Sequence, residues 1–374
     1  MSWLEQHSLS ERYAVEAEAA LRKGDADAAT SLYGLAATAE LAALSEIDVL
    51  KIRTLGVTVV SAAALFFKAK DYRKAEVIAH QWLSSDHLPG FASGQLEEIL
   101  QAIWNEKAIS RSGIEFKGTE ILISVKGGEV VHGGAPLDII ATKVEQVSAI
   151  FYRTAELLLG RPHRTRGGPA EDIREICRPW LFQTVPGSYQ FAVRVQGPKQ
   201  GSLFAHEAVK SEKIAFKFLE IMKASAEDPV GALVETVPDP QYRVTFLKLT
   251  RNLAPTGDSF DQLLVKPVLS NASAIVLKSE TRAGINEVIR NTRPQATQME
   301  RELQFHGILR ALHLDEDWLE ISVPTENALM RVKVFGAGDA VDDLIGPMVN
   351  RRVVLDVLEV RPDRYTFRDI QLAD

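Results

Sequence analysis

The chain has 374 residues, of which 46% are hydrophobic and 25% are charged, a composition typical of a globular protein with two or three domains of roughly 100–200 residues each. Its formal net charge of -7 argues against a general, charge-driven nucleic-acid binder, because such proteins carry a strongly basic face. The single cysteine, Cys177, excludes a disulfide framework or a cysteine-rich zinc site within one chain.

Targeting and membrane signals are weak in this sequence. Residues 1–7 lack the basic start and the apolar run of a secretory signal peptide. The longest apolar stretch, residues 57–67, is shorter than the about 20 residues that a helix needs to cross a bilayer. We therefore expect a reducing, cytoplasmic location without membrane contact, and we interpret residues 57–67 as a buried helix.

Residues 1–111 are expected to form a helical domain, since they are rich in Ala, Leu and Glu and contain only one proline, Pro89. Apolar residues at helical spacing stand on both sides of a short polar turn at 23–25, and the same arrangement recurs around a turn at 68–71. This pattern predicts two helical hairpins, and aligning Ala29 with Ala75 gives a repeat period of 46 residues.

The two hairpins resemble the tetratricopeptide repeat. The positions that match the family are Gly24, Ala26, Ala29 and Tyr33 in the first unit and Tyr72, Ala75 and Ala79 in the second, which Pro89 closes. Those expected to pack the repeat helices together are Gly24, Ala29, Tyr33, Tyr72, Ala75 and Ala79. The resemblance implies a domain that binds other proteins. The observed period is longer than the roughly 34 residues of the family, and two units are visible where stable stacks usually need three. A generic helical bundle with small residues at its crossings is the alternative.

Residues 112–293 are expected to form an α+β domain. Paired glycines predict a hairpin turn at 126–129, and Pro136 stands at the start of a long helix that reaches Leu158. Strands and helices mix here without strict alternation, which favours an α+β arrangement over a doubly wound one. The expected strands are 114–116, 120–125, 130–132, 188–195, 261–267 and 274–278, and the expected helices after Leu158 are 171–177, 211–224, 229–235, 240–253 and 281–291.

Residues 294–374 are rich in alternating and β-branched segments. Five strands are predicted, at 303–312, 317–323, 328–335, 351–360 and 364–371, with one helical turn at 341–346. Five short strands separated by turn residues are typical of a small β-barrel or sandwich. We expect a small β-barrel, SH3-like or similar, as the third domain of a multidomain α+β protein.

The best candidate for a ligand site is the glycine-bounded segment 160–168. It carries four basic residues at the end of the long helix, namely Arg161, His163, Arg164 and Arg166. Arginine forks match the geometry of phosphate oxygens, so the segment predicts contact with a phosphate, a nucleotide or an RNA backbone. The alternative is that these cations complement the dipole of the helix C-terminus and are otherwise solvated.

A second basic set lies on the helix predicted at 240–253. Arg243, Lys248 and Arg251 either form an anion-facing edge or belong to a solvated helix face. The eight histidines are scattered, with no pair at the i, i+4 spacing of a helical metal site. We therefore predict no metal, no cofactor and no catalytic residue.

Two functions follow from these patterns. The first is a non-catalytic cytoplasmic adaptor, scaffold or complex subunit that acts through protein–protein contacts of the helical domain. The second is a protein that binds nucleic acid or nucleotide phosphate through segment 160–168 and the C-terminal barrel. An enzyme of unrecognised type in the central domain stays open, and the oligomeric state is not indicated.

Overall fold

A computed structural model describes residues 2–22, 25–85, 87–112, 120–131, 134–182, 189–196, 209–257, 259–267, 273–292, 300–325, 328–338 and 341–373. The described residues divide into two compact units: a helical one up to residue 112, and one that contains the described residues from 120 onward. The parts that we expected to be a central and a C-terminal domain therefore belong to the same unit.

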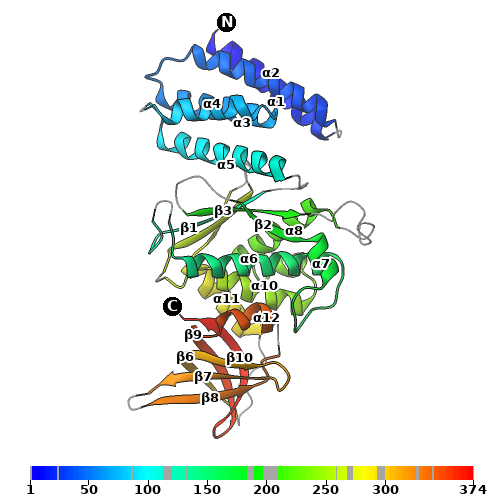
Figure 1. Ribbon diagram of the computed structural model, residues 1–374, viewed down its shortest axis with the longest axis vertical. Coiled ribbons are helices and arrows are strands. Elements are labelled where there is room, and N and C mark those ends of the chain that lie inside the picture. The colour runs from blue at the N-terminus through cyan, green and yellow to red at the C-terminus, as the bar shows by residue number, and fades with distance from the viewer. Residues whose placement is uncertain are drawn as a thin grey trace. The chain divides into compact units, whose positions relative to one another are not determined.

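The first unit is built of five helices among its described residues (Figure 1). These are α1 (Trp3–Arg22), α2 (Ala26–Ser45), α3 (Ile52–Lys68), α4 (Tyr72–Leu83) and α5 (Gly90–Ser112). Helix α1 packs on α2, α2 on α3, and α3 on both α4 and α5. Alanines that are at most 1% exposed fill these crossings, so the helix backbones can approach closely; they include Ala29, Ala36, Ala37, Ala62, Ala63, Ala75 and Ala79.

Aspartates set the starts of the second helix of each hairpin. Asp25 accepts a hydrogen bond from the backbone N–H of Ala28 at 3.0 Å, and Asp71 accepts one from that of Lys74 at 3.1 Å. Each bond satisfies one of the backbone donors that a helix leaves free in its first turn. The polar turns that the sequence shows at these two places are thus helix caps.

The second unit contains a five-stranded antiparallel sheet in the order β2-β3-β1-β4-β5. Its strands are β1 (Ile121–Lys126), β2 (Arg178–Phe182), β3 (Gln190–Gln196), β4 (Gln262–Pro267) and β5 (Ile275–Leu277). The structure confirms the expected strands at the places of β1, β3, β4 and β5. Strand β2 was not predicted, since Arg178 and Pro179 open it and its burial follows no clean alternation.

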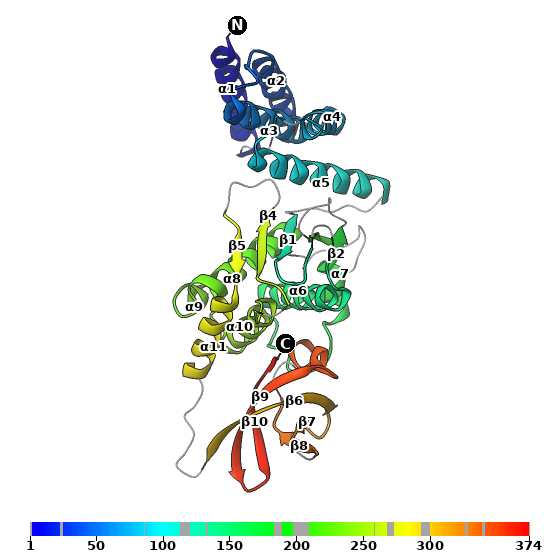
Figure 2. The same ribbon diagram turned by 90° about the vertical axis from the view of Figure 1, so that its left-hand side faces the viewer.

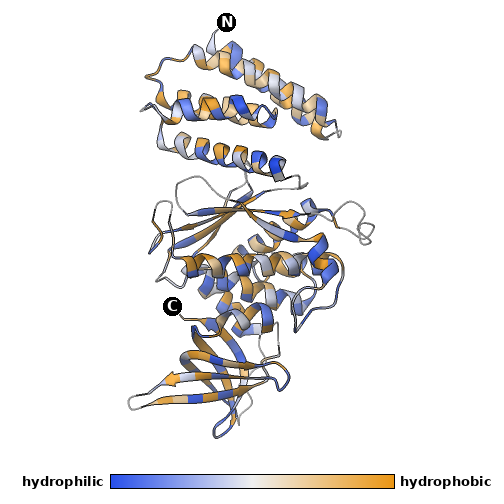
Figure 3. Ribbon diagram, in the orientation of Figure 1, coloured by the Kyte–Doolittle hydropathy of each residue, from blue (hydrophilic) through white to orange (hydrophobic). Residues whose placement is uncertain are grey.

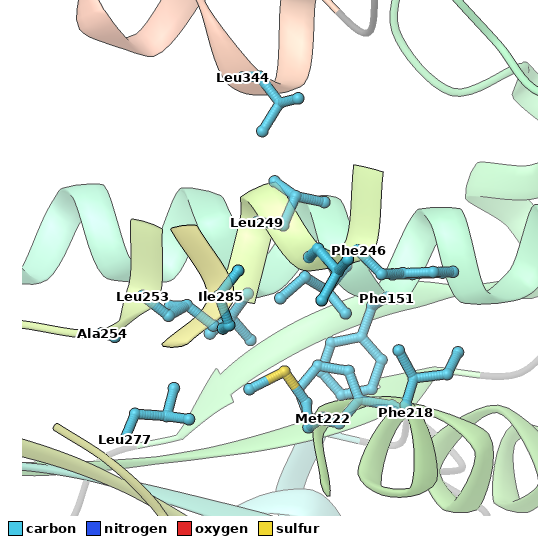
Figure 4. Close-up of a cluster of buried hydrophobic side chains, with 14 of the residues drawn as sticks. Phe151, Phe218, Met222, Phe246, Leu249, Leu253, Ala254, Leu277, Ile285 and Leu344 are labelled. Atoms are coloured by element: carbon cyan, nitrogen blue, oxygen red, sulfur yellow. The ribbon is translucent and has the colours of Figure 1, made fainter. Parts of the chain in front are cut away.

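A layer of helices covers one face of this sheet (Figures 1 and 2). The helices of the unit before β6 are α6 (Leu137–Leu158), α7 (Glu171–Ile176), α8 (Ser211–Glu227), α9 (Ala232–Thr236), α10 (Pro240–Leu253) and α11 (Ser279–Thr292). Phe151 of α6 and Phe218 of α8 stack with ring centroids 4.1 Å apart at the centre of the core. Figure 4 shows this core continuing through Leu249 of α10 to Leu344.

The C-terminal strands lie on the other side of this helical layer (Figure 1). They are β6 (Arg301–His313), β7 (Trp318–Pro324), β8 (Leu329–Phe335), β9 (Arg352–Arg361) and β10 (Arg364–Leu372), with α12 (Val341–Leu344) and the 3-10 turn η1 (Gly346–Met348) between β8 and β9. Strand β6 pairs with β7 and β9, β7 with β8, and β9 with β10, all antiparallel. Strand β10 also pairs with β8, in parallel over two residues.

These strands match the five predicted ones, and hydrophobic and hydrophilic residues alternate along them (Figure 3).

Of the remaining expectations, a strand at 114–116 lies outside the described residues. The strand expected at 130–132 was wrong for its described part, because Val130 and Val131 form only isolated bridges, to Gly127 and Gly134. The structure has mixed helix and sheet, and among the described residues no helix is both long and apolar enough to cross a membrane.

Candidate functional site

Each basic side chain of segment 160–168 has a partner inside the second unit. Arg161 pairs with Asp172 of α7 at 2.6 Å (Nη2 to Oδ2), and Arg166 lies 3.6 Å from Asp317 (Nη2 to Oδ1). His163 shares a hydrogen bond of 2.8 Å between its Nε2 and the Thr245 hydroxyl. The segment is basic in sequence, but its charges are largely balanced by neighbouring carboxylates.

Arg164 belongs to a group of four charges, two buried and two partly buried, which we call the α6–α12 cluster: Arg153, Glu156, Arg164 and Asp343. Arg164 donates from Nε to Glu156 at 2.9 Å and lies 3.1 Å from Asp343 through Nη2. Arg153, fully buried on α6, donates from Nε to the same Asp343 oxygen at 2.7 Å. Two arginines and two carboxylates leave no net charge to attract an external anion.

Backbone contacts hold segment 160–168 against α12. The Gly167 N–H donates to Asp342 Oδ2 at 2.6 Å, and the Val341 N–H donates to the Thr165 carbonyl at 3.2 Å. Gly167 has a φ of +78°, in the left-handed region that favours glycine. The segment therefore connects the helical layer to the C-terminal part of the same unit.

The second basic set is also used internally. Arg243 donates to the carbonyl oxygens of Val237 (2.9 Å) and Pro238, which precede its own helix. Arg251 is fully buried and pairs with Asp369 of β10, and Lys248 lies 3.5 Å from the same carboxylate. The structure therefore does not join Arg243, Lys248 and Arg251 into one solvent-facing edge, which sequence spacing alone could not reveal.

The expected packing residues of the repeat lie in the helical unit. Ala29, Ala75 and Ala79 are at most 1% exposed and Tyr33 is 4% exposed, while Gly24 lies outside the described residues. Tyr72 is half-buried, with its ring centroid 5.5 Å from that of Phe67.

A feature that the sequence analysis missed is an apolar turn between the two hairpins. Residues 48–52, which we call the apolar turn, comprise the end of the connection from α2 and the first residue of α3. Val49, Leu50 and Ile52 have exposed fractions of 49%, 82% and 50% there. The backbone of this turn is fixed, because the Leu50 N–H donates to the Asp48 side chain at 3.0 Å and the Lys51 N–H to the Asp48 carbonyl at 2.9 Å. Three large apolar side chains are thus exposed within four consecutive residues, and their burial against a partner would be favourable.

In the part of the chain that the structure describes, no group of three or more His, Cys, Asp or Glu side chains is placed to hold a metal ion. Comparison with protein-family models, with curated proteins and with solved structures finds no match to this chain.

Proposed function

We propose that the protein is a non-catalytic cytoplasmic adaptor, or a subunit of a larger complex, and that its helical unit holds a protein partner. The observation that carries the proposal is the apolar turn at residues 48–52. Leu50, at 82% exposed, is a large aliphatic side chain held out by a backbone with fixed hydrogen bonds. The resemblance of the two hairpins to tetratricopeptide repeats gives the proposal independent support.

The energetics of apolar burial favour a protein surface as the partner that covers this turn. Full burial of one aliphatic side chain contributes about 1.5–3 kcal/mol, and a few such residues supply most of the affinity in many interfaces. Val49, Leu50 and Ile52 are close in sequence, and exposed charges of both signs, on Asp48, Lys51 and Arg53, stand among and beside them. A partner surface with an apolar pocket and a polar rim of mixed charge would match this arrangement.

The test is affinity purification of the full-length tagged protein at its native level. We expect one stoichiometric protein partner, and we expect the double variant Leu50→Ser/Ile52→Ser to lose it. Val15→Ser is the matched control, because Val15 is 62% exposed on α1 outside the apolar turn. Recovery of no partner, together with a monomer in analytical ultracentrifugation, would count against the adaptor function; so would full retention of the partner by the double variant.

The finer fold assignment is also a proposal. We infer that β6–β10 form a small barrel of the SH3-like kind, supported by a ring of pairings in which β10 contacts both β9 and β8.

The alternative function, nucleic-acid binding through segment 160–168, has weaker support, since the three arginines of that segment each have a carboxylate within 4 Å. Charge reversal at Arg161, Arg164 and Arg166 should abolish such binding, and unchanged binding would contradict this alternative.

A further inference from the structure

A cavity of about 340 Å³ lies in the second unit, away from segment 160–168. It is formed where the start of α6, the end of α10 and the turn after β1 meet the C-terminal strands. The polar side chains that line it include those of Glu129, Asp138, Lys143, Thr256, Arg282 and Arg351. Its size lies within the range of small-molecule sites.

One wall of the cavity is fixed by two glycines. Gly127 and Gly128 have φ values of +80° and +60°, and an added Cβ would lie 1.9 Å from Asp261 Oδ2 and 2.4 Å from the Ser259 carbonyl oxygen, respectively. Backbone bonds of 2.9 Å join Glu129 N–H to Ser259 O and Asp261 N–H to Lys126 O. The turn and the segment after residue 258 are thus packed backbone to backbone, which gives the cavity a preformed side.

Two of the cations that line the cavity bond to the end of α10. Lys143 Nζ donates to the Asn252 carbonyl at 2.6 Å and lies 5.0 Å from the centroid of the Phe260 ring. Arg282 Nη1 donates to the Arg251 carbonyl at 3.1 Å. Both satisfy carbonyls that the last turn of a helix leaves free, so both side chains are held in place.

Arg351, a third cation of the cavity lining, is different. It is half-buried, and its guanidinium has no hydrogen bond or ion pair with any residue that the structure describes. The Thr256 hydroxyl oxygen is shielded from solvent and has no hydrogen-bond partner within the described structure. A shielded hydroxyl without a partner costs free energy, and rotation of the Thr256 side chain about χ1 toward a bound ligand would remove that cost.

We propose that this cavity binds a small molecule through an oxyanion group, either a phosphate or a carboxylate, which Arg351 and Lys143 hold and Thr256 contacts. Guanidinium and ammonium donors form strong, charge-assisted bonds to such oxygens. The carboxylates of Glu129 and Asp138 at the rim suit hydroxyl or amino groups on the remainder of the molecule. The proposal is independent of the protein partner of the helical unit.

The test is isothermal titration calorimetry of the full chain at low ionic strength, with inorganic phosphate and with succinate as separate probes. We expect saturable binding of at least one probe at one site per chain. Binding of phosphate alone assigns the natural ligand to the phosphate esters, and binding of succinate alone assigns it to the carboxylic acids. Binding of both supports a general oxyanion site.

Variants locate the site. Arg351→Gln is expected to weaken binding about tenfold or more, since it removes a charge-assisted interaction, and Thr256→Val to weaken it to a smaller extent. Arg352→Gln is the matched control, because Arg352 is the exposed neighbour that does not line this cavity. Absence of saturable binding for both probes overturns the proposal. Equal affinities for wild type, Arg351→Gln and Thr256→Val overturn it as well.

Discussion

Arg251 of α10 and Asp369 of β10, 118 positions apart in the chain, form a buried ion pair between the helical layer and the C-terminal strands of the second unit. The guanidinium also donates through Nη2 to the Ile370 carbonyl at 2.7 Å. Lys248 approaches the same carboxylate at 3.5 Å, so one aspartate is the shared counter-ion of two buried cations. The α6–α12 cluster makes a similar link through Asp343, so two carboxylates after residue 338 anchor basic residues of the helical layer.

This buried ion pair predicts that Asp369→Asn strongly lowers the free energy of unfolding. The substitution keeps the size of the side chain but leaves Arg251 and Lys248 as buried charges without a counter-ion. Breaking a buried pair in this way costs about 3–5 kcal/mol. We expect a loss of that order in the free energy of unfolding, measured by urea denaturation of the full chain.

Glu320→Gln is the control for this experiment. Glu320 pairs with Arg331 at 3.5 Å, but the Arg331 side chain is 78% exposed, and such surface pairs contribute about 0–1 kcal/mol. Similar losses for the two variants would show that the Arg251–Asp369 pair does not connect the two parts in solution.

A pair of glycines tests the close packing of the helical unit. At Gly56 of α3, an added Cβ would lie 2.7 Å from Pro89 Cγ and 3.0 Å from Ala92 Cβ, whereas at Gly94 of α5 it would meet nothing within 4 Å. We expect Gly56→Ala to destabilise the unit by about 1–3 kcal/mol through overpacking. Gly94→Ala should stabilise it by about 0.5–1 kcal/mol, because alanine is the better helix former.

Thermal unfolding followed by circular dichroism distinguishes the two glycine variants. The expected result is a lower midpoint for Gly56→Ala and a higher one for Gly94→Ala, relative to the wild type. An increase for both would mean that α3 and α5 are not packed closely at this point.

The elements of this fold were largely predictable, because local signals define them. Pro136 precedes α6 directly, and alternation of apolar residues marked the five C-terminal strands. Strand β2 escaped prediction because Pro179 lies within it; proline removes a ladder hydrogen bond and usually indicates an edge strand, which is the position that β2 takes.

The surroundings of the candidate basic residues were not predictable, because their partners are distant in sequence. Arg164 and Asp343 are 179 positions apart, so no local pattern shows that the arginine is neutralised. Spacing along a helix placed Arg251 on a face, but only the packing of β10 on α10 shows that this face is buried. The composition of segment 160–168 therefore predicted a ligand site, whereas in the structure the basic side chains of this segment contact other parts of their own unit.

The cap of α4 gives a prediction with a pH dependence. The hydrogen bond and the ion pair with Lys74 lower the pKa of Asp71 below its ordinary value. Its contribution to the free energy of unfolding is therefore complete above the ordinary carboxyl pKa of about 4 and is lost as the pH falls through the lowered value. We expect Asp71→Ala to cost about 1 kcal/mol at pH 7 and Asp71→Ser to cost less, because serine also caps helices.

Urea denaturation at a series of pH values below 7 checks this prediction. The difference between wild type and Asp71→Ala should shrink as the pH falls below the ordinary carboxyl pKa of about 4 and through the lowered value. A difference that is independent of pH would show that the carboxylate form does not cap α4.

The last prediction concerns Cys177, whose thiol is fully buried and lies 3.6 Å from the Phe151 carbonyl oxygen. Burial raises the pKa of the thiol, and the nearby Glu156 carboxylate raises it further. Since the thiolate is the reactive form, we expect the folded protein to resist labelling by Ellman's reagent at pH 8, and the protein unfolded in guanidinium to react at once.

The raised pKa also affects the free energy of unfolding. This free energy is independent of the thiol below its ordinary pKa of about 8.5 and falls as the pH rises above that value, because only the unfolded state ionises there. Cys177→Ala should reduce this alkaline loss, and rapid labelling of the native protein would contradict the buried position of the thiol.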